Sequence, residues 1–180
     1  MSFLDKIVSA VTPPESDEDR MEVRQNARQM AASSGWLSLA VSHHDQIEAA
    51  FNATRDSTSE VEARTAAKKL ATLLVAHSIA EEVVLYPVLV IEGHKANAAA
   101  AYQEQQMAKI EMAELERLTP LSEDWRDKLG HIRGAVLHHI YEEEKTWFPE
   151  IIQEASGTDQ AMLDARFSEE FERSMGRAPA

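Results

Sequence analysis

The chain of 180 residues is long enough for one domain with short tails. It is 44% hydrophobic and 27% charged, and 18 basic against 31 acidic residues give it a formal charge of −13. This balance argues against binding to nucleic acid or to an anionic membrane surface, because both depend on lysine and arginine. The chain has no cysteine, so thiolate chemistry is excluded and any metal or catalytic site falls to the seven histidines and the carboxylates.

The N-terminal segment, residues 1–33, does not have the pattern of a secretory signal. Apolar residues at helical spacing from Phe3 to Val11 predict a short amphipathic helix, and an acidic, proline-containing linker follows from Val11 to Arg20. No stretch approaches the ~20 apolar residues of a membrane span. We therefore expect no membrane span and a cytoplasmic location.

Four long segments with helical periodicity follow, and no window alternates long enough to predict a strand. Short connections between long helices favour antiparallel neighbours, so the expected fold is an all-α, up-down-up-down four-helix bundle over residues 34–155. Residues 156–180 form a tail with one extra helix. The predicted helices are Ser34–Arg55, Ser59–Glu92, Lys95–Leu118, Ser122–Ala155 and, in the tail, Asp159–Met175.

Two of these helices carry related motifs. The sequence HSIAEEVVLYP begins at His77, and HIYEEEKTWFP begins at His139. In each, a glutamate four residues after the histidine, Glu81 or Glu143, lies one turn along the same helix face. One helix can thereby offer a metal both an imidazole and a carboxylate. A single His-x-x-x-Glu is weak evidence, but two copies that share a second glutamate and an aromatic-Pro ending indicate a metal site.

The spacing of the motifs extends to the other two helices. His44 lies 33 residues before His77, on the apolar stripe of the first long helix. The residue 34 before His139 is Gln105, at the middle of the third helix, where a repeated helix pair would place a second lone histidine.

His44, the two His-x-x-x-Glu pairs with their aromatic-Pro endings and the four-helix layout resemble the hemerythrin-like HHE cation-binding proteins, over residues 34–155. The resemblance implies a bundle that holds two non-haem iron ions bridged by oxygen (oxo or hydroxo) and carboxylates, with manganese or zinc as weaker candidates. It assigns as ligands His44, His77, Glu81, His139 and Glu143. Family members commonly have Glu-His in the third helix where this chain has Glu104-Gln105, so the sequence departs from the family at one expected ligand.

Glutamine offers a neutral amide oxygen, which is a poorer iron ligand than imidazole. Three arrangements follow. Gln105 binds weakly or through water and leaves an open position, which we favour because Gln105 shares the apolar stripe of its helix; or Glu104 rotates in as a carboxylate ligand; or one metal position is partly vacant.

The remaining polar candidates have competing interpretations. His43 and His138 are reserve ligands in the two histidine doublets, although a surface location is favoured for both. Glu142 and Glu144 are predicted to lie on a solvated face, and Glu82 is either exposed or an acceptor for a ligand histidine. We expect His94 and His131 to face solvent or cap helices, and the tryptophans and Tyr86 and Tyr141 to serve packing, with Tyr86 lining the metal pocket as the alternative.

The resemblance favours a binding protein for O2 or NO in sensing, storage or delivery. The alternatives are a di-iron oxidase, peroxidase or catalase-like scavenger of peroxide, or an iron buffer, and a metal-free structural bundle is the simplest competing interpretation.

Overall fold

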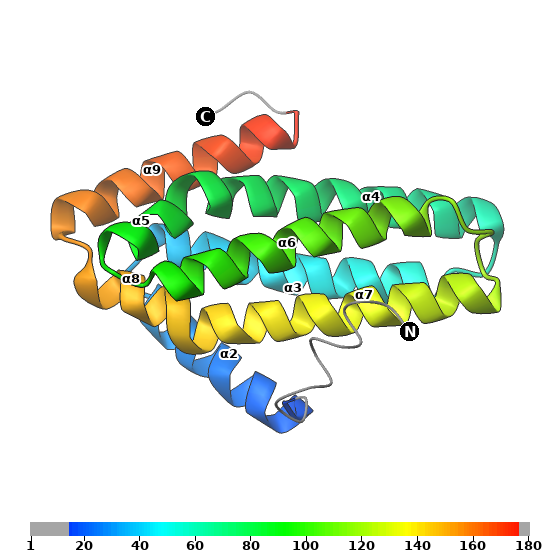
Figure 1. Cartoon of the computed structure of the whole chain (residues 1–180), viewed down its shortest axis with the longest axis horizontal. Helices are drawn as coiled ribbons and strands as arrows, with labels where there is room; N and C mark the ends of the chain where they lie inside the picture. Colours follow the sequence, from blue (N-terminus) through cyan, green and yellow to red (C-terminus); the bar gives the residue numbers. More distant parts are fainter. Residues whose placement is uncertain (1–14, 177–180) are drawn as a thin grey trace.

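The computed structural model describes residues 15–176, and within this range it is helical without a strand. Four antiparallel rods make the predicted bundle (Figure 1). Two rods are single helices, α3 (Gly35–Arg55) and α6 (Lys95–Leu115). The other two are each interrupted by a π-helical turn: α4 (Glu60–Ala80), η1 (Glu81–Leu85) and α5 (Tyr86–Ile91), and α7 (Glu123–Glu142), η2 (Glu143–Trp147) and α8 (Phe148–Glu154).

Serine residues set the start of four of the predicted helices. Ser34, Ser59, Ser122 and Ser156 are the N-caps of α3, α4, α7 and α9 (Gly157–Ser174), and each hydroxyl accepts a hydrogen bond from the backbone N–H three residues later. Such caps satisfy backbone donors that have no partner inside the helix. The helix starts predicted from the sequence are therefore confirmed to within one or two residues. The predicted end of the third helix, Leu118, is three residues too late, because α6 ends at Leu115.

A helix that the sequence did not predict, α2 (Asp17–Ala31), precedes the bundle. The predicted linker to Arg20 is wrong in its second half. Ser16 and Asp19 form a reciprocal capping box, and acidic residues fill the first turn, where they interact favourably with the helix dipole. The predicted helix from Phe3 to Val11 lies outside the described residues.

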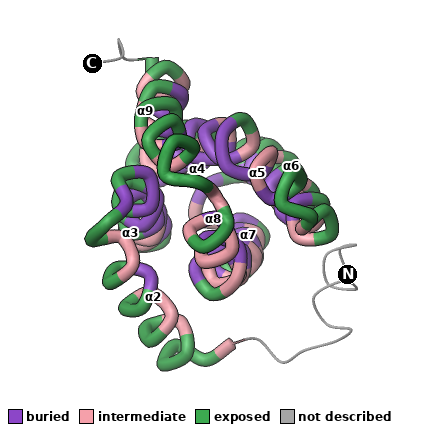
Figure 2. The backbone as a smooth tube through the Cα atoms, turned by 90° about the vertical axis from the view of Figure 1, so that its left-hand side faces the viewer, coloured by how far each residue is buried: buried purple, intermediate pink, exposed green. Residues whose placement is uncertain are grey.

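The helices α2 and α9 (Gly157–Ser174) cover two sides of the bundle. The helix α2 packs against α3 and η2, whereas α9 packs against α4 and α3. In the end view of Figure 2, the buried faces of the rods turn toward one interior. That interior is aromatic at the end where α8 and α9 meet α3, because Trp36, Phe148 and Phe167 are fully buried there.

The two π-helical turns occupy equivalent places. In each rod the interruption begins at the motif glutamate and ends just before the aromatic-Pro pair. The backbone N–H of Tyr86 donates to the carbonyl of Glu81, and that of Phe148 donates to the carbonyl of Glu143, five residues back. Proline has no N–H and clashes with the preceding turn, so a π turn ahead of it lets the rod continue.

The rod from Glu60 to Ile91 is long and apolar enough to cross a membrane by length and composition alone. However, 56% of its most apolar window is buried inside the bundle, as expected for a core helix, so it is weak evidence for a span.

Candidate metal centre

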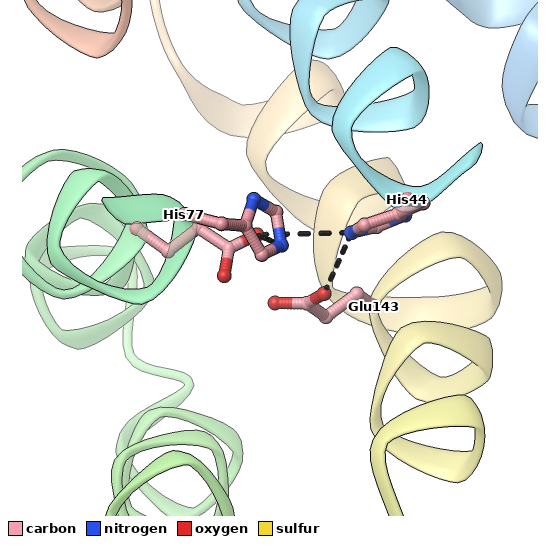
Figure 3. A group of neighbouring side chains, drawn as sticks. His44, His77 and Glu143 are labelled. Carbon is pink, nitrogen blue, oxygen red and sulfur yellow. Dashed lines mark ion pairs between the residues drawn. The ribbon is translucent and has the colours of Figure 1, made fainter. Parts of the chain in front are cut away.

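Four buried side chains from three rods converge in the bundle interior. His44 comes from α3, His77 from α4, Glu81 from the start of η1 and Glu143 from the start of η2. One ligand atom from each lies within 4.8 Å of the others. Figure 3 shows His44, His77 and Glu143 pointing toward one another. We call this group of four the His44 position.

The facing atoms of this group have no hydrogen-bond partner. They are Nε2 of His44, Nε2 of His77, Oε1 of Glu81 and Oε2 of Glu143, all buried. His44 Nε2 lies 3.2 Å from Glu143 Oε2, and His77 Nε2 lies 3.2 Å from Glu81 Oε1. A buried polar atom without a partner costs about 1–3 kcal/mol, and a cation between these four atoms would satisfy all of them. The donor set therefore fits a metal ion, with imidazole and carboxylate ligands that suit iron, manganese or zinc.

The other oxygens of Glu81 and Glu143 face a second group, formed by His139, Gln105 and the Tyr86 hydroxyl. We call this group the His139 position. Glu143 Oε1 lies 3.3 Å from His139 Nε2 and accepts a hydrogen bond of 2.9 Å from the Tyr86 hydroxyl. Glu81 Oε2 accepts a hydrogen bond of 2.6 Å from the Gln105 amide. Each glutamate thus presents one oxygen to each position, which is the arrangement of a bridging ligand.

Carboxylates also hold the outer nitrogens of two ring ligands. His44 Nδ1 is 2.7 Å from Glu144, whose carboxylate is paired with Arg24 of α2 at 2.5 Å. His139 Nδ1 is 2.8 Å from Glu104. A carboxylate at Nδ1 favours the tautomer with its proton there, so Nε2 keeps its lone pair for a metal.

Burial and mutual charge shift the titration of the cluster. Burial, with repulsion from Glu143, raises the pKa of Glu81 well above its usual value. Burial acts in the same direction on Glu143, but His139 and His44 outweigh it and hold the pKa of that carboxyl well below its usual value. Burial and the nearby His44 lower the pKa of His77. His77 is thereby kept in the neutral form that binds metal.

The structure brings the six predicted site residues together, because Gln105 and His139 adjoin the four side chains of the His44 position. Among the reserve residues, His43 is buried rather than on the surface, since α9 covers it and its ring stacks on Phe171. Burial and the adjacent His44 lower its pKa to about 4. His138 is partly exposed and pairs with Glu15, and Glu104 binds the outer nitrogen of His139.

Three other residues at the centre have roles that the sequence analysis missed or gave only as an alternative. Glu144 was expected on a solvated face but is 3% exposed, because α2 covers it and brings Arg24 to it. For Tyr86, packing was favoured and a place in the metal pocket was the alternative; its hydroxyl points into the His139 position, in line with the alternative. Pro87 was a usable signal in the sequence, because it marks the π-helical turn that orients the Tyr86 side chain. No local pattern identifies Arg24, whose contact is tertiary.

The other histidines and Glu82 lie away from the ligand atoms. His94 is the N-cap residue of α6 and is paired with Glu150 and Glu154 of α8, while His131 is half-buried on α7. Glu82 accepts from Lys109 and Gln106 instead of from a ligand histidine.

A cavity of about 80 Å³ reaches the centre between α4, α6 and α7. Its walls are mainly apolar, and its polar lining includes His77, Gln105 and His139. This volume is large enough to hold a water molecule or another small ligand.

A four-helix bundle with an inward cluster of histidines and bridging carboxylates defines a class of cation-binding proteins. The model of the hemerythrin HHE cation-binding domain matches residues 37–151, so the chain belongs to that family. Comparisons with curated proteins and with solved structures give no significant match. As a member of this family the protein has a domain that binds metal cations, and its buried His/Glu cluster could hold one.

Proposed function

We propose that this protein holds two iron ions and binds O2 or NO for sensing, storage or delivery. One ion takes the His44 position and the other the His139 position, with Glu81 and Glu143 shared between them. The ferrous ions supply the affinity for O2 or NO. The protein supplies neutral imidazoles, two bridging carboxylates and a water-poor interior.

The observation that carries this proposal is the apolar cavity against the cluster. Its volume of about 80 Å³ admits a diatomic molecule such as O2 or NO. Its apolar lining, which includes Ile47, Leu74 and Val136, favours uncharged molecules over ions. Because His77 and His139 line the cavity, a molecule bound there would lie beside both proposed metal positions.

One observation favours a second candidate, turnover of peroxide. The Tyr86 hydroxyl and the Gln105 amide lie within hydrogen-bond distance of each other and of the bridging carboxylates. Proton donors beside a redox metal favour cleavage of the O–O bond over reversible binding.

We also propose the cytoplasmic location that the sequence predicts. Cell fractionation would test this location.

Optical titration of the iron-loaded, reduced protein separates the two candidates. For a carrier or sensor, we expect O2 or NO to change the spectrum at about one equivalent per chain, and removal of the gas to restore it over repeated cycles. Steady gas release from added peroxide would instead establish the scavenger. A purified protein that holds zinc alone, by elemental analysis, would contradict both.

A further inference from the structure

The two halves of the bundle differ at the positions where a repeat would make them alike. The α3 half, which runs from α3 to α5, supplies His44, whereas the α6 half, which runs from α6 to α8, supplies Gln105, which has no ring nitrogen. The aromatic residue before proline also differs, since Phe148 stacks on His44 and Tyr86 approaches Gln105. Each aromatic residue thus lies beside the lone-helix residue of the other half, and the metal position that lacks a second ring nitrogen is the one whose aromatic residue carries a hydroxyl.

The Tyr86 hydroxyl lies among the ligand atoms of the His139 position. Its oxygen is 2.9 Å from Glu143 Oε1, 3.2 Å from His139 Nε2 and 3.4 Å from Glu81 Oε2. Ligands bound to one cation at about 2.1 Å and at right angles lie about 3 Å from one another. The Tyr86 oxygen therefore lies from each of the other three atoms at about the spacing of ligands that share one metal ion.

Gln105 is placed to support that oxygen. Its amide nitrogen lies 2.6 Å from the Tyr86 oxygen and 2.6 Å from Glu81 Oε2, so its two N–H groups can donate to both. The side chain of Tyr86 is fully buried, and the partners of its hydroxyl are side chains of the centre.

We propose that Tyr86 is a ligand of the metal at the His139 position, where its oxygen takes the place of the imidazole that the chain lacks at residue 105. Gln105 is a positioning residue that donates a hydrogen bond to the same oxygen. This inference rests on the two-metal centre of the proposed function. When the metal binds, the phenol O–H bond breaks, a metal–oxygen bond forms and the proton passes to solvent.

The chemistry of the ligand provides the test, because a phenolate bound to ferric iron produces a visible charge-transfer band. Metal-free protein is loaded with two equivalents of ferrous iron without oxygen and then oxidised in air. We expect a visible band whose resonance Raman spectrum contains the ring vibrations of a bound phenolate. Tyr86→Phe should lose the band and bind the second equivalent of iron at least about 10-fold more weakly, while the first equivalent stays bound.

The chain offers a matched control, since it has only three tyrosines: Tyr86, Tyr102 and Tyr141. Tyr102 packs edge-on against Tyr86 at 5.1 Å, but its hydroxyl donates to the carbonyl oxygen of Glu82. The double variant Tyr102→Phe/Tyr141→Phe leaves Tyr86 as the sole tyrosine and should keep the full phenolate spectrum. Loss of the spectrum in this variant would overturn the assignment.

The wild-type measurement decides the matter even if Tyr86→Phe fails to fold. Two bound irons without phenolate vibrations would overturn the role of Tyr86 and leave the two-iron centre intact. Saturation at one iron per chain, or none, would overturn both proposals.

Discussion

The α3 half and the α6 half of the bundle share a scaffold and differ in chemistry. Each has a His-x-x-x-Glu pair, a π-helical turn that starts at the glutamate and a proline that follows an aromatic residue. The halves differ in two kinds of residue. One is the polar residue of the uninterrupted helix, His44 or Gln105, and the other is the aromatic residue that contacts it, Phe148 or Tyr86. Both halves thus supply a bridging carboxylate from the same point of the repeat, whereas the remaining ligands differ between the two metal positions.

The halves also differ in how firmly their histidines are held. Glu144, which binds His44, is buried and backed by Arg24, and Arg24 is itself paired with Asp45 and Glu48. Glu104, which binds His139, has a side chain that is 38% exposed and has no cation paired with it among residues 15–176. The His44 position is thus the more firmly held of the two, because the carboxylate at His44 Nδ1 is buried and paired with a cation.

The largest effect on iron binding is expected from the loss of a carboxylate that both metal positions share. Glu143→Ala removes one ligand from both positions and leaves the buried His44 and His139 without their common partner. We expect loss of both irons by elemental analysis and a decrease of about 3 kcal/mol in the free energy of unfolding of the metal-free protein, measured in urea. The adjacent Glu142→Ala should change neither. One iron retained in Glu143→Ala would show that the halves do not share this ligand.

A second large effect is expected when residue 105 is made equivalent to His44. Gln105→His restores the nitrogen that the repeat lacks, so we expect the second iron to bind about 10-fold or more tightly and the optical spectrum to change. Competition with a metal-binding dye would measure the affinity. Gln106→His introduces the same side chain at the exposed neighbouring residue and should have no effect. An unchanged iron content and spectrum in Gln105→His would mean that residue 105 does not face the metal.

Much of the fold could be predicted from the sequence because its determinants are local. Apolar periodicity predicted the rods to within about three residues. In the structure, Ser34, Ser59 and Ser122 cap the starts of three of them. The π-helical turns were missed because a continuous helical pattern assumes a rotation of 100° per residue, which the turns at Glu81 and Glu143 break. Pro87 and Pro149 were the available signals.

The site could be predicted in part for the same reason. The spacing within each helix identified His77, Glu81, His139 and Glu143 as groups that share a face, and the structure brings them together with His44. The roles of Glu144 and Arg24 depend on how α2 crosses η2, a contact between segments far apart in the chain. No local pattern encodes it.

The smallest effects on iron affinity are expected from the two carboxylates that contact ligand histidines at Nδ1, which are Glu144 and Glu104. Glu144→Gln keeps the shape of the side chain but removes the charge that orients His44 and pairs with Arg24. We expect the first iron to bind about 10- to 100-fold more weakly, as is typical when an acceptor for a metal-bound histidine is lost. Glu104→Gln removes the corresponding partner of His139, but its half-exposed carboxylate is screened by water, so the second iron should weaken by less than about 10-fold. Stepwise titration of each metal-free variant with ferrous iron measures both values. Equal losses would contradict the view that α2 makes the His44 position the more rigid of the two.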